Sequence, residues 1–329
     1  MKRKFVTEYA IGYMNSYTAM LTAHQLMKGG EISESLQSDL SKCHIYIIAA
    51  RPLPYFKHES LRHENNKLSG TIGYRIAGEE KLAQFDDYRW ELEDDAIKLS
   101  CEYPYREIKS LNAENKEVTY LPASYLTGAY ISKTANKIED LDRYEVLYVG
   151  QAFGNQGGRS AVERLRSHST LQKILALTSH DHPDKEIMIF MYDFEHSQII
   201  SSMDGRAKDA DNTEKNETRL FNAMGNPPNN KQKIGMIEAA LIRYFKPAYN
   251  EIFKIKFPST KHKVLESCRK LDISGLVVEL DSSDLNLKLY SQQVSPISHH
   301  IIQIDLVSGK NRQSFFFFTG FANNPEVIK

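Results

Sequence analysis

The sequence has few cysteines and no long apolar run. Its three cysteines, Cys43, Cys101 and Cys268, lie far apart and show no metal-ligand or redox spacing. Such scattered cysteines argue against a disulfide framework and are typical of a reducing compartment. The longest apolar runs are far shorter than the roughly 18–20 residues that span a bilayer. We therefore expect a cytoplasmic protein with no membrane partner.

A net charge is also lacking, because 42 Lys and Arg residues balance 42 Asp and Glu residues. Bulk charge therefore gives no sign of a polyanionic partner. Locally the balance differs: residues 79–102 hold nine acids and three bases, whereas residues 231–270 hold ten bases and three acids. The basic segment suits contacts with a phosphate backbone. The simpler alternative for both segments is a solvated surface.

The length of 329 residues suits two or three domains. We predict an α+β chain with an N-terminal accessory region of mixed α/β structure (1–120), a central domain (121–258) and a small β-rich C-terminal region (262–329). In the first region, residues 44–48 and 70–76 have the β-branched and aromatic content of strands, and residues 13–27 are predicted to form a helix.

In the central range, residues 126–131 and 146–151 are predicted strands, and a helix is predicted from Ser160 through His168. Residues 186–194 are almost all apolar, which indicates a strand covered on both faces. Residues 235–244 show helical spacing and end before Pro247. Beyond them, the pattern predicts strands at 275–280, 285–290, 301–306 and 315–318, the last a buried run of four phenylalanines.

Several polar residues of the central range follow one another in a fixed order. Gly128-Ala129-Tyr130 precedes Tyr148-Val149-Gly150, and Arg164 is followed four positions later by His168. Glu238 then lies in the pattern Glu-x-x-Leu-Ile, with Pro247 and Asn250 after it. Each residue alone is weak evidence, and the ordered combination is specific.

Over residues 126–251 this combination resembles the GIY-YIG family of metal-dependent endonucleases. The resemblance implies a small antiparallel sheet flanked by helices, in which two tyrosine-bearing strands lie side by side. It also implies that Glu238 holds Mg²⁺ or Mn²⁺. The catalytic residues that it implies are Tyr130, Tyr148, Arg164, His168 and Asn250.

These residue types suit phosphodiester hydrolysis. A divalent cation and a guanidinium offset the charge that develops on the phosphate and leaving oxygens. Glu238 lies in an otherwise apolar helix, where an ionised carboxylate needs a partner, solvent or a metal. One carboxylate with several waters is a suitable Mg²⁺ site. Asn250 is expected to position the Glu238 helix through hydrogen bonds.

The sequence departs from the family pattern at two places. Residues 131–147 make a long link between Tyr130 and Tyr148, so Tyr125 is the alternative first tyrosine. The glycine-rich stretch 154–158 widens the spacing to Arg164 and brings Arg159 near the site, either as a phosphate contact or as a surface turn. We expect Arg159, Arg166, Lys254 and Lys256 to contact nucleic acid.

The predicted function is therefore endonucleolytic cleavage of double-stranded DNA, in restriction, anti-phage defence or a mobile element. One alternative is a nucleic-acid-binding or assembly protein that keeps the scaffold without catalysis, and another is an RNA-directed nuclease. The accessory regions are candidates for target choice, for binding a protein partner or for forming a homo-oligomer.

Overall fold

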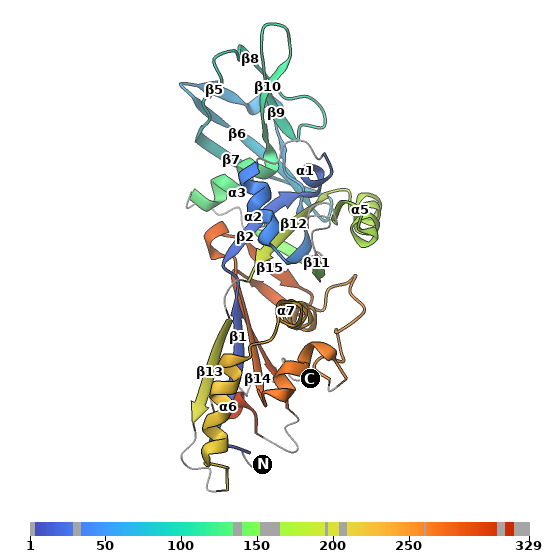
Figure 1. The fold of residues 1–329 in the computed structure, drawn as a ribbon. Coiled ribbons are helices and arrows are strands. Elements are labelled where there is room, and N and C mark those ends of the chain that lie inside the picture. Colours follow the sequence, from blue (N-terminus) through green and yellow to red (C-terminus); the bar gives the residue numbers. More distant parts are fainter. Residues whose placement is uncertain are drawn as a thin grey trace.

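The computed structural model describes residues 4–28, 34–133, 140–151, 165–194, 197–203, 209–259, 261–307 and 313–318. The chain is an α+β protein with several sheets, and most of their strand pairs are antiparallel. The sheets are spread along an elongated molecule with the six-stranded sheet in the middle (Figure 1). The predicted fold class, α+β, is confirmed.

The six-stranded sheet has the order β16-β15-β11-β3-β12-β2. Its strands are β2 (Tyr17–Thr22), β3 (Ile45–Pro52), β11 (Arg143–Gln151), β12 (Lys185–Asp193), β15 (Lys288–Ser291) and β16 (Val294–Ile297). Neighbouring strands are antiparallel except for β11 and β15, which are parallel. β3 thus lies between β11 and β12, although residues 53–142 separate β3 from β11 in the sequence.

Both faces of this sheet are covered, which explains the unbroken apolar runs of β3 and β12. On the first face, α7 (Asn230–Phe245) shares a buried cluster with Ile47 and Phe190. On the second face, a cluster with Tyr46 and Ile48 includes side chains of the helices α1 (Ala23–Lys28), α2 (Glu34–Lys42) and α5 (Ser169–Asp181). The alternation of side chains along β3 therefore assigns Tyr46 to the second face.

Residues 53–142 form an inserted module at one end of the molecule (Figure 1). Its longest hairpin joins β6 (Lys67–Ile76) and β7 (Glu79–Arg89). The other elements are β4 (Tyr55–Phe56), η1 (His58–Ser60), β5 (Arg62–Glu64), β8 (Lys98–Ser100), β9 (Glu107–Leu111), β10 (Glu117–Pro122) and α3 (Ala123–Lys133). Phe56, Leu68 and Phe85 belong to a buried cluster within this module, so it has a core of its own.

The fully buried Arg51 of β3 ties the module to the central sheet. Its Nε donates to Glu186 Oε1 of β12 at 2.6 Å, and one terminal nitrogen donates to Tyr144 Oη at 2.8 Å. Module groups accept the remaining bonds, at the carbonyls of Leu141 (3.1 Å) and Ser124 (3.0 Å) and at Thr127 Oγ1 (3.2 Å). A buried guanidinium needs such partners, because an unpaired buried charge is strongly destabilising.

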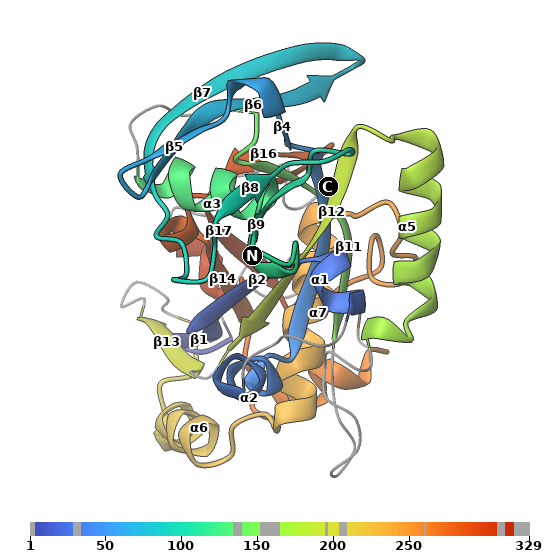
Figure 2. The same cartoon turned by 90° about the horizontal axis from the view of Figure 1, so that it is seen from above.

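A second sheet, of order β13-β1-β14-β17, lies towards the other end of the molecule (Figure 1). Its strands are β1 (Thr7–Met14), β13 (Ser197–Met203), β14 (Gly275–Asp281) and β17 (His299–Asp305). Other described helices are α6 (Glu214–Gly225), η2 (Lys263–Leu265), α8 (Glu266–Lys270), η3 (Ser283–Leu285) and η4 (Phe315–Phe318). Seen from above, α5 and α6 lie well apart on the outside of the molecule (Figure 2).

Strands from all three predicted sequence ranges meet in the six-stranded sheet: β2 and β3 from the first, β11 and β12 from the second, β15 and β16 from the third. The ranges 1–120, 121–258 and 262–329 therefore share one sheet. Within the described part of the chain, no helix is long and apolar enough to cross a membrane.

Three predicted elements away from His168 are wrong. Residues 13–22 of the predicted helix belong mainly to β1 and β2, and helix begins only at Ala23. The predicted strand 126–131 lies within helix α3, whose Thr127 hydroxyl donates to the carbonyl of Ala123. The phenylalanine run is the 3₁₀ helix η4, although Phe315 and Phe316 are buried as expected.

Candidate functional site

Two tyrosines meet on the second face of the central sheet. Tyr148 lies on β11, and Tyr46 lies on the neighbouring strand β3 as the register partner of Gly150. The centroids of the two tyrosine rings are 6.0 Å apart, with 32° between the ring planes. Tyr46 is 2% exposed and Tyr148 is half-buried, so solvent reaches the pair mainly from the Tyr148 side.

Gly150 leaves the space that this pair occupies. A Cβ atom at position 150 would lie 2.5 Å from the Tyr46 ring and 2.7 Å from the Tyr148 ring. Both distances are shorter than real Cβ contacts allow, so any side chain here would displace the rings. The glycine is therefore required for packing rather than for an unusual backbone angle.

His168 joins the tyrosines in a cluster of three rings. Its Nε2 lies 3.4 Å from Tyr46 Oη, and its ring centroid lies 6.0 Å from that of Tyr46 and 5.6 Å from that of Tyr148. Which of the two hydrogen-bonding atoms donates is set by the imidazole tautomer. His168 is half-buried, so the cluster combines one covered hydroxyl with two partly accessible side chains.

The backbone around His168 differs from the prediction. A single helix carrying both Arg164 and His168 is wrong, because the chain turns at Ser167 and His168 is extended (φ −79°, ψ 115°) just before α5. The backbone N–H of His168 donates to the carbonyl of Leu165 at 3.0 Å, which closes this turn. Arg159 and Arg164 lie outside the described residues.

The strand beside Tyr148 is not the predicted one. Tyr130 lies on helix α3 of the inserted module, and its side chain is outside the described residues. The alternative, Tyr125, lies on the same helix and is 58% exposed. Tyr46 of β3 instead occupies the place next to Tyr148 that was expected of Tyr130.

Sequence reasoning missed Tyr46 for a specific reason. The strand predicted at residues 44–48 is β3, but the resemblance implies a partner strand for β11 that directly precedes it in the chain. The sequence does contain a sign of Tyr46: both Tyr46 and Tyr148 lie in short apolar runs that are typical of strands. A search for a second tyrosine-bearing strand without a limit on spacing would have found it.

Glu238 is the half-buried carboxylate of α7. Its neighbours Ile237 and Ala239 are fully buried, and α7 packs against β11 and β3 on the first face of the sheet. A capping box fixes where this helix begins, because Asn229 and Gln232 exchange side-chain-to-backbone bonds of 3.0 and 3.2 Å. The register of α7, and with it the position of Glu238, is thereby defined.

Asn250 binds the edge of β11 beside Tyr148. Its Nδ2 donates to the carbonyl of Val149 at 2.8 Å, and its Oδ1 accepts from the N–H of Val149 at 2.9 Å. The N–H of Tyr249 donates to the carbonyl of Leu147 at 3.1 Å. β15 pairs only with residues 143–145 of β11, so this segment covers the strand edge that β15 leaves open. Asn250 thus positions the Tyr148 strand, and both of its polar side-chain atoms bind backbone.

The tyrosine cluster and the helix that carries Glu238 pack on opposite faces of the central sheet. Tyr46 and Tyr148 belong to the cluster on the second face, whereas α7 belongs to that on the first. The chain that leaves α7 crosses the edge of β11 and places Tyr249 against the second face. Tyr148, His168 and Asn250 therefore lie around the Tyr148 end of β11, whereas Glu238 lies on the helix that packs against the other face.

The predicted nucleic-acid contacts differ in their surroundings. The Nε of Arg166 donates to the carbonyl of Leu26 at 2.6 Å, which ties the residue to α1. Lys254 is half-buried, and its Nζ donates to the carbonyl of Ala248 at 3.2 Å. Lys256 is exposed. Of the described residues in this set, Lys256 is the most accessible to a phosphate.

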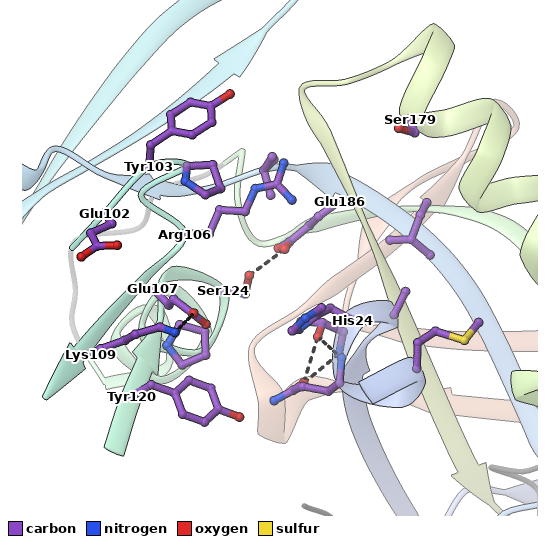
Figure 3. Close-up of a pocket in the computed structure, with 18 of the residues that line it drawn as sticks. His24, Glu102, Tyr103, Arg106, Glu107, Lys109, Tyr120, Ser124, Ser179 and Glu186 are labelled. Carbon is purple, nitrogen blue, oxygen red and sulfur yellow. Dashed lines mark hydrogen bonds and ion pairs between the residues drawn. The ribbon is translucent and has the colours of Figure 1, made fainter. Parts of the chain in front are cut away.

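A pocket with a volume of about 1130 Å³ lies between the inserted module and the core. Figure 3 shows Arg106 and Tyr120 extending into it from the module, with His24 on the core side. Much of its charge is paired: Lys109 binds Glu107 and Glu117 at 3.2 and 2.8 Å, and Glu186 binds Arg51 at 2.6 Å. This pocket contains none of the sequence-predicted site residues.

Comparison of the chain with protein-family models, with curated proteins and with solved structures finds no match. A functional assignment therefore rests on the residues themselves and on the geometry described above.

Proposed function

We propose that this chain is a metal-dependent endonuclease that hydrolyses phosphodiester bonds in DNA, with its centre at the Tyr148 end of β11. The observation that carries the proposal is the pairing of Tyr46 and Tyr148 on adjacent antiparallel strands, with Gly150 opposite Tyr46. Two tyrosine-bearing strands side by side are what the resemblance to the GIY-YIG family implies. The strand that supplies the first tyrosine is β3.

The three rings can move a proton away from an attacking water. A neutral imidazole with its proton on Nδ1 accepts from Tyr46 Oη through Nε2, across the 3.4 Å that separates them. A water that reaches Tyr46 from the Tyr148 side can therefore give a proton to the Tyr46 hydroxyl as that hydroxyl passes its own proton to His168. A phenol alone is a weak base, since its ordinary pKa is about 10. The half-buried Tyr148 is accessible to donate a hydrogen bond to a phosphate oxygen.

Glu238 is the residue that would hold the metal ion. Among the described residues, no group of three His, Cys, Asp or Glu side chains is placed to bind a metal. A hydrated Mg²⁺ fits a lone carboxylate, because Mg²⁺ keeps several waters and binds proteins through one or two carboxylates. Mn²⁺ is the alternative ion. When bound, such an ion supplies positive charge to the phosphate and the leaving oxygen.

Local charge supports a DNA substrate on the α7 side. Residues 231–270 carry ten bases against three acids, whereas residues 79–102 of the inserted module carry nine acids against three bases. A duplex is therefore attracted to the α7 side and repelled by β7 and the segment after it. A role in restriction, anti-phage defence or a mobile element remains a prediction.

A plasmid-nicking assay tests the proposal. Wild-type protein with supercoiled plasmid and Mg²⁺ or Mn²⁺ is expected to give nicked and linear DNA. Glu238→Ala and Tyr46→Phe are expected to lower the nicking rate by about 100-fold or more, the scale on which general acid–base groups act. Tyr130→Phe is the matched control and is expected to keep the wild-type rate. RNA of the same sequence tests the alternative substrate.

Three outcomes would contradict the proposal or its details. A protein that binds the plasmid without nicking it in either metal favours the silent nucleic-acid-binding alternative. Nicking at the wild-type rate by Glu238→Ala excludes the metal role of that residue. If Tyr130→Phe loses activity and Tyr46→Phe does not, then the first catalytic tyrosine is Tyr130 of α3 and not Tyr46.

A further inference from the structure

Two isoleucines project from the loop that follows α7. In this segment, which we term the prong loop (residues 251–257), Ile252 is 70% exposed and Ile255 is 80% exposed. Isolated exposed apolar residues are common on protein surfaces. Two large exposed ones within four residues, next to a candidate active site, are less expected.

The prong loop is held in place from within. The Phe257 ring is 1% exposed, and its centroid lies 5.8 Å from that of Phe253 and 5.7 Å from that of His262. A terminal nitrogen of Arg243 on α7 donates to the carbonyl of Lys254 at 2.8 Å. The aromatic residues anchor the loop, so Ile252 and Ile255 are presented to solvent by a supported backbone.

The prong loop begins at the candidate catalytic edge. Asn250, bonded to Val149 next to Tyr148, immediately precedes it. Two residues of chain span at most about 7 Å, so Ile252 lies within that distance of Asn250 along the backbone. Anything that contacts Ile252 is therefore adjacent to the edge of β11.

The surroundings of the isoleucines are basic. Residues 243–263 carry six bases, with Glu251 as the single acid. Lys256, Lys261 and Lys263 are exposed. Lysines that neutralise phosphates, combined with apolar side chains that enter between base pairs, are features of proteins that bind and kink DNA through the minor groove.

We propose that the prong loop inserts Ile252 and Ile255 into the minor groove of duplex DNA and unstacks a base step beside the scissile phosphate. This inference rests on the proposed nuclease function, which it extends to a substrate class: duplexes that are easily kinked or already unstacked. Deformable pyrimidine–purine steps and mismatched sites are cut in preference, because less stacking is lost when the isoleucines enter.

The test separates DNA distortion from cleavage. Wild-type protein in EDTA is mixed with short duplexes that carry 2-aminopurine, a fluorescent adenine analogue whose emission rises when it is unstacked. Binding of wild-type protein raises the emission at one or a few positions. The double variant Ile252→Ser with Ile255→Ser binds the same duplexes, since the lysines remain, but abolishes this rise. Ile252→Leu with Ile255→Leu restores it.

Cleavage is measured in parallel with Mg²⁺. The double serine variant nicks a fully paired duplex about tenfold more slowly, because its side chains no longer wedge the base step open, and nicks a duplex mismatched at the cut site at nearly the wild-type rate. Ile97→Ser is the matched control, because Ile97 is 67% exposed but lies in the inserted module. It leaves both readouts unchanged, and circular dichroism confirms the fold of each variant.

The outcomes are distinguishable. If wild-type protein unstacks DNA but never cleaves it, the nuclease proposal falls and the prong loop proposal stands. If it cleaves DNA without a rise in emission, or if the serine variant matches wild type in both assays, the prong loop proposal is overturned. Binding of the isoleucines to anionic lipid vesicles, with no effect on DNA, overturns it in favour of a membrane surface.

Discussion

The strictest steric requirement in the candidate site falls on Gly150. Its missing side chain is what allows the Tyr46 and Tyr148 rings to lie against β11. We expect Gly150→Ala to force the two rings apart, to lower nicking as severely as Tyr46→Phe does, and to cost about 1–3 kcal/mol of stability through overpacking. Plasmid nicking and urea unfolding measure the two effects.

Gly225 provides the control for that substitution. A Cβ atom at position 225 would meet nothing within 4 Å. Gly225→Ala is therefore expected to keep the nicking rate, and its midpoint of unfolding should not fall, because Gly225 ends helix α6 and alanine is the better helix former. If Gly150→Ala behaved like Gly225→Ala, the close approach of the two tyrosines to β11 would not matter for activity.

His300 gives the chain a pH-dependent stability. It lies on β17, fully buried against α7, where its Nδ1 lies 3.2 Å from Tyr244 Oη, and burial lowers the pKa of His300 to about 4. Unfolded, it takes up a proton near pH 6.5. The unfolded chain therefore binds this proton more readily than the folded chain, so stability is complete above pH 6.5 and falls as the pH falls towards 4. Between pH 7 and pH 5 the free energy of unfolding should drop by about 2 kcal/mol.

The measurement is urea unfolding at pH 7 and pH 5 for wild type and for His300→Gln. The variant has no ring to protonate, so its free energy of unfolding should fall less with pH than that of wild type. Equal losses in the two proteins would show that His300 does not titrate in this window.

At the scale of elements, the sequence predicts those strands whose two faces are both covered. β3 and β12 combine β-branched and aromatic residues in short apolar runs, and both were predicted. Helix α7 was also predicted, because its apolar residues follow helical spacing. These are the elements in which local pattern and tertiary burial agree.

The wrong elements are those whose local preference yields to tertiary packing. Residues 13–22 could continue a helix, but their pairing with β14 and β12 makes them strands. Residues 126–131 contain aromatic and β-branched residues typical of a strand, yet α3 buries Leu126 in the core of the module. The sequence within a short window does not contain these long-range partners.

At the scale of the whole molecule, β3 and β11 form a hairpin whose connection has been replaced by the inserted module. The first tyrosine of the site therefore precedes the second by about 100 residues. Tyr148, His168, Glu238 and Asn250 stay predicted site residues, because their order and their neighbouring residues form a pattern in the sequence. Tyr46 lies outside that pattern, because the inserted module separates the two paired strands and a local window does not indicate how much chain lies between them.

The inserted module should be removable. Replacing residues 53–142 with a two- to five-residue hairpin turn, the usual length for such a connection, would join β3 directly to β11. Arg51 would lose its module partners, so Arg51→Met and Glu186→Leu accompany the deletion. We expect a protein that unfolds cooperatively on heating and still nicks plasmid.

Far-UV circular dichroism during heating, together with the nicking assay, decides that prediction. A folded but inactive product would mean that the module contributes directly to the site. A product without a cooperative transition would mean that the central sheet depends on the module for its stability.

The same hairpin has a consequence for biosynthesis. β3 leaves the ribosome well before β11 and β12, the two strands that cover its edges. At roughly 5–20 residues per second, the wait of about 100 residues for β11 lasts on the order of 5–20 s. During that time Ile45 to Ala50, a run with no charged residue, presents two open edges, which is the pattern of an aggregation-prone segment. The yield of folded protein thus depends on what shields β3 until β11 has been synthesised.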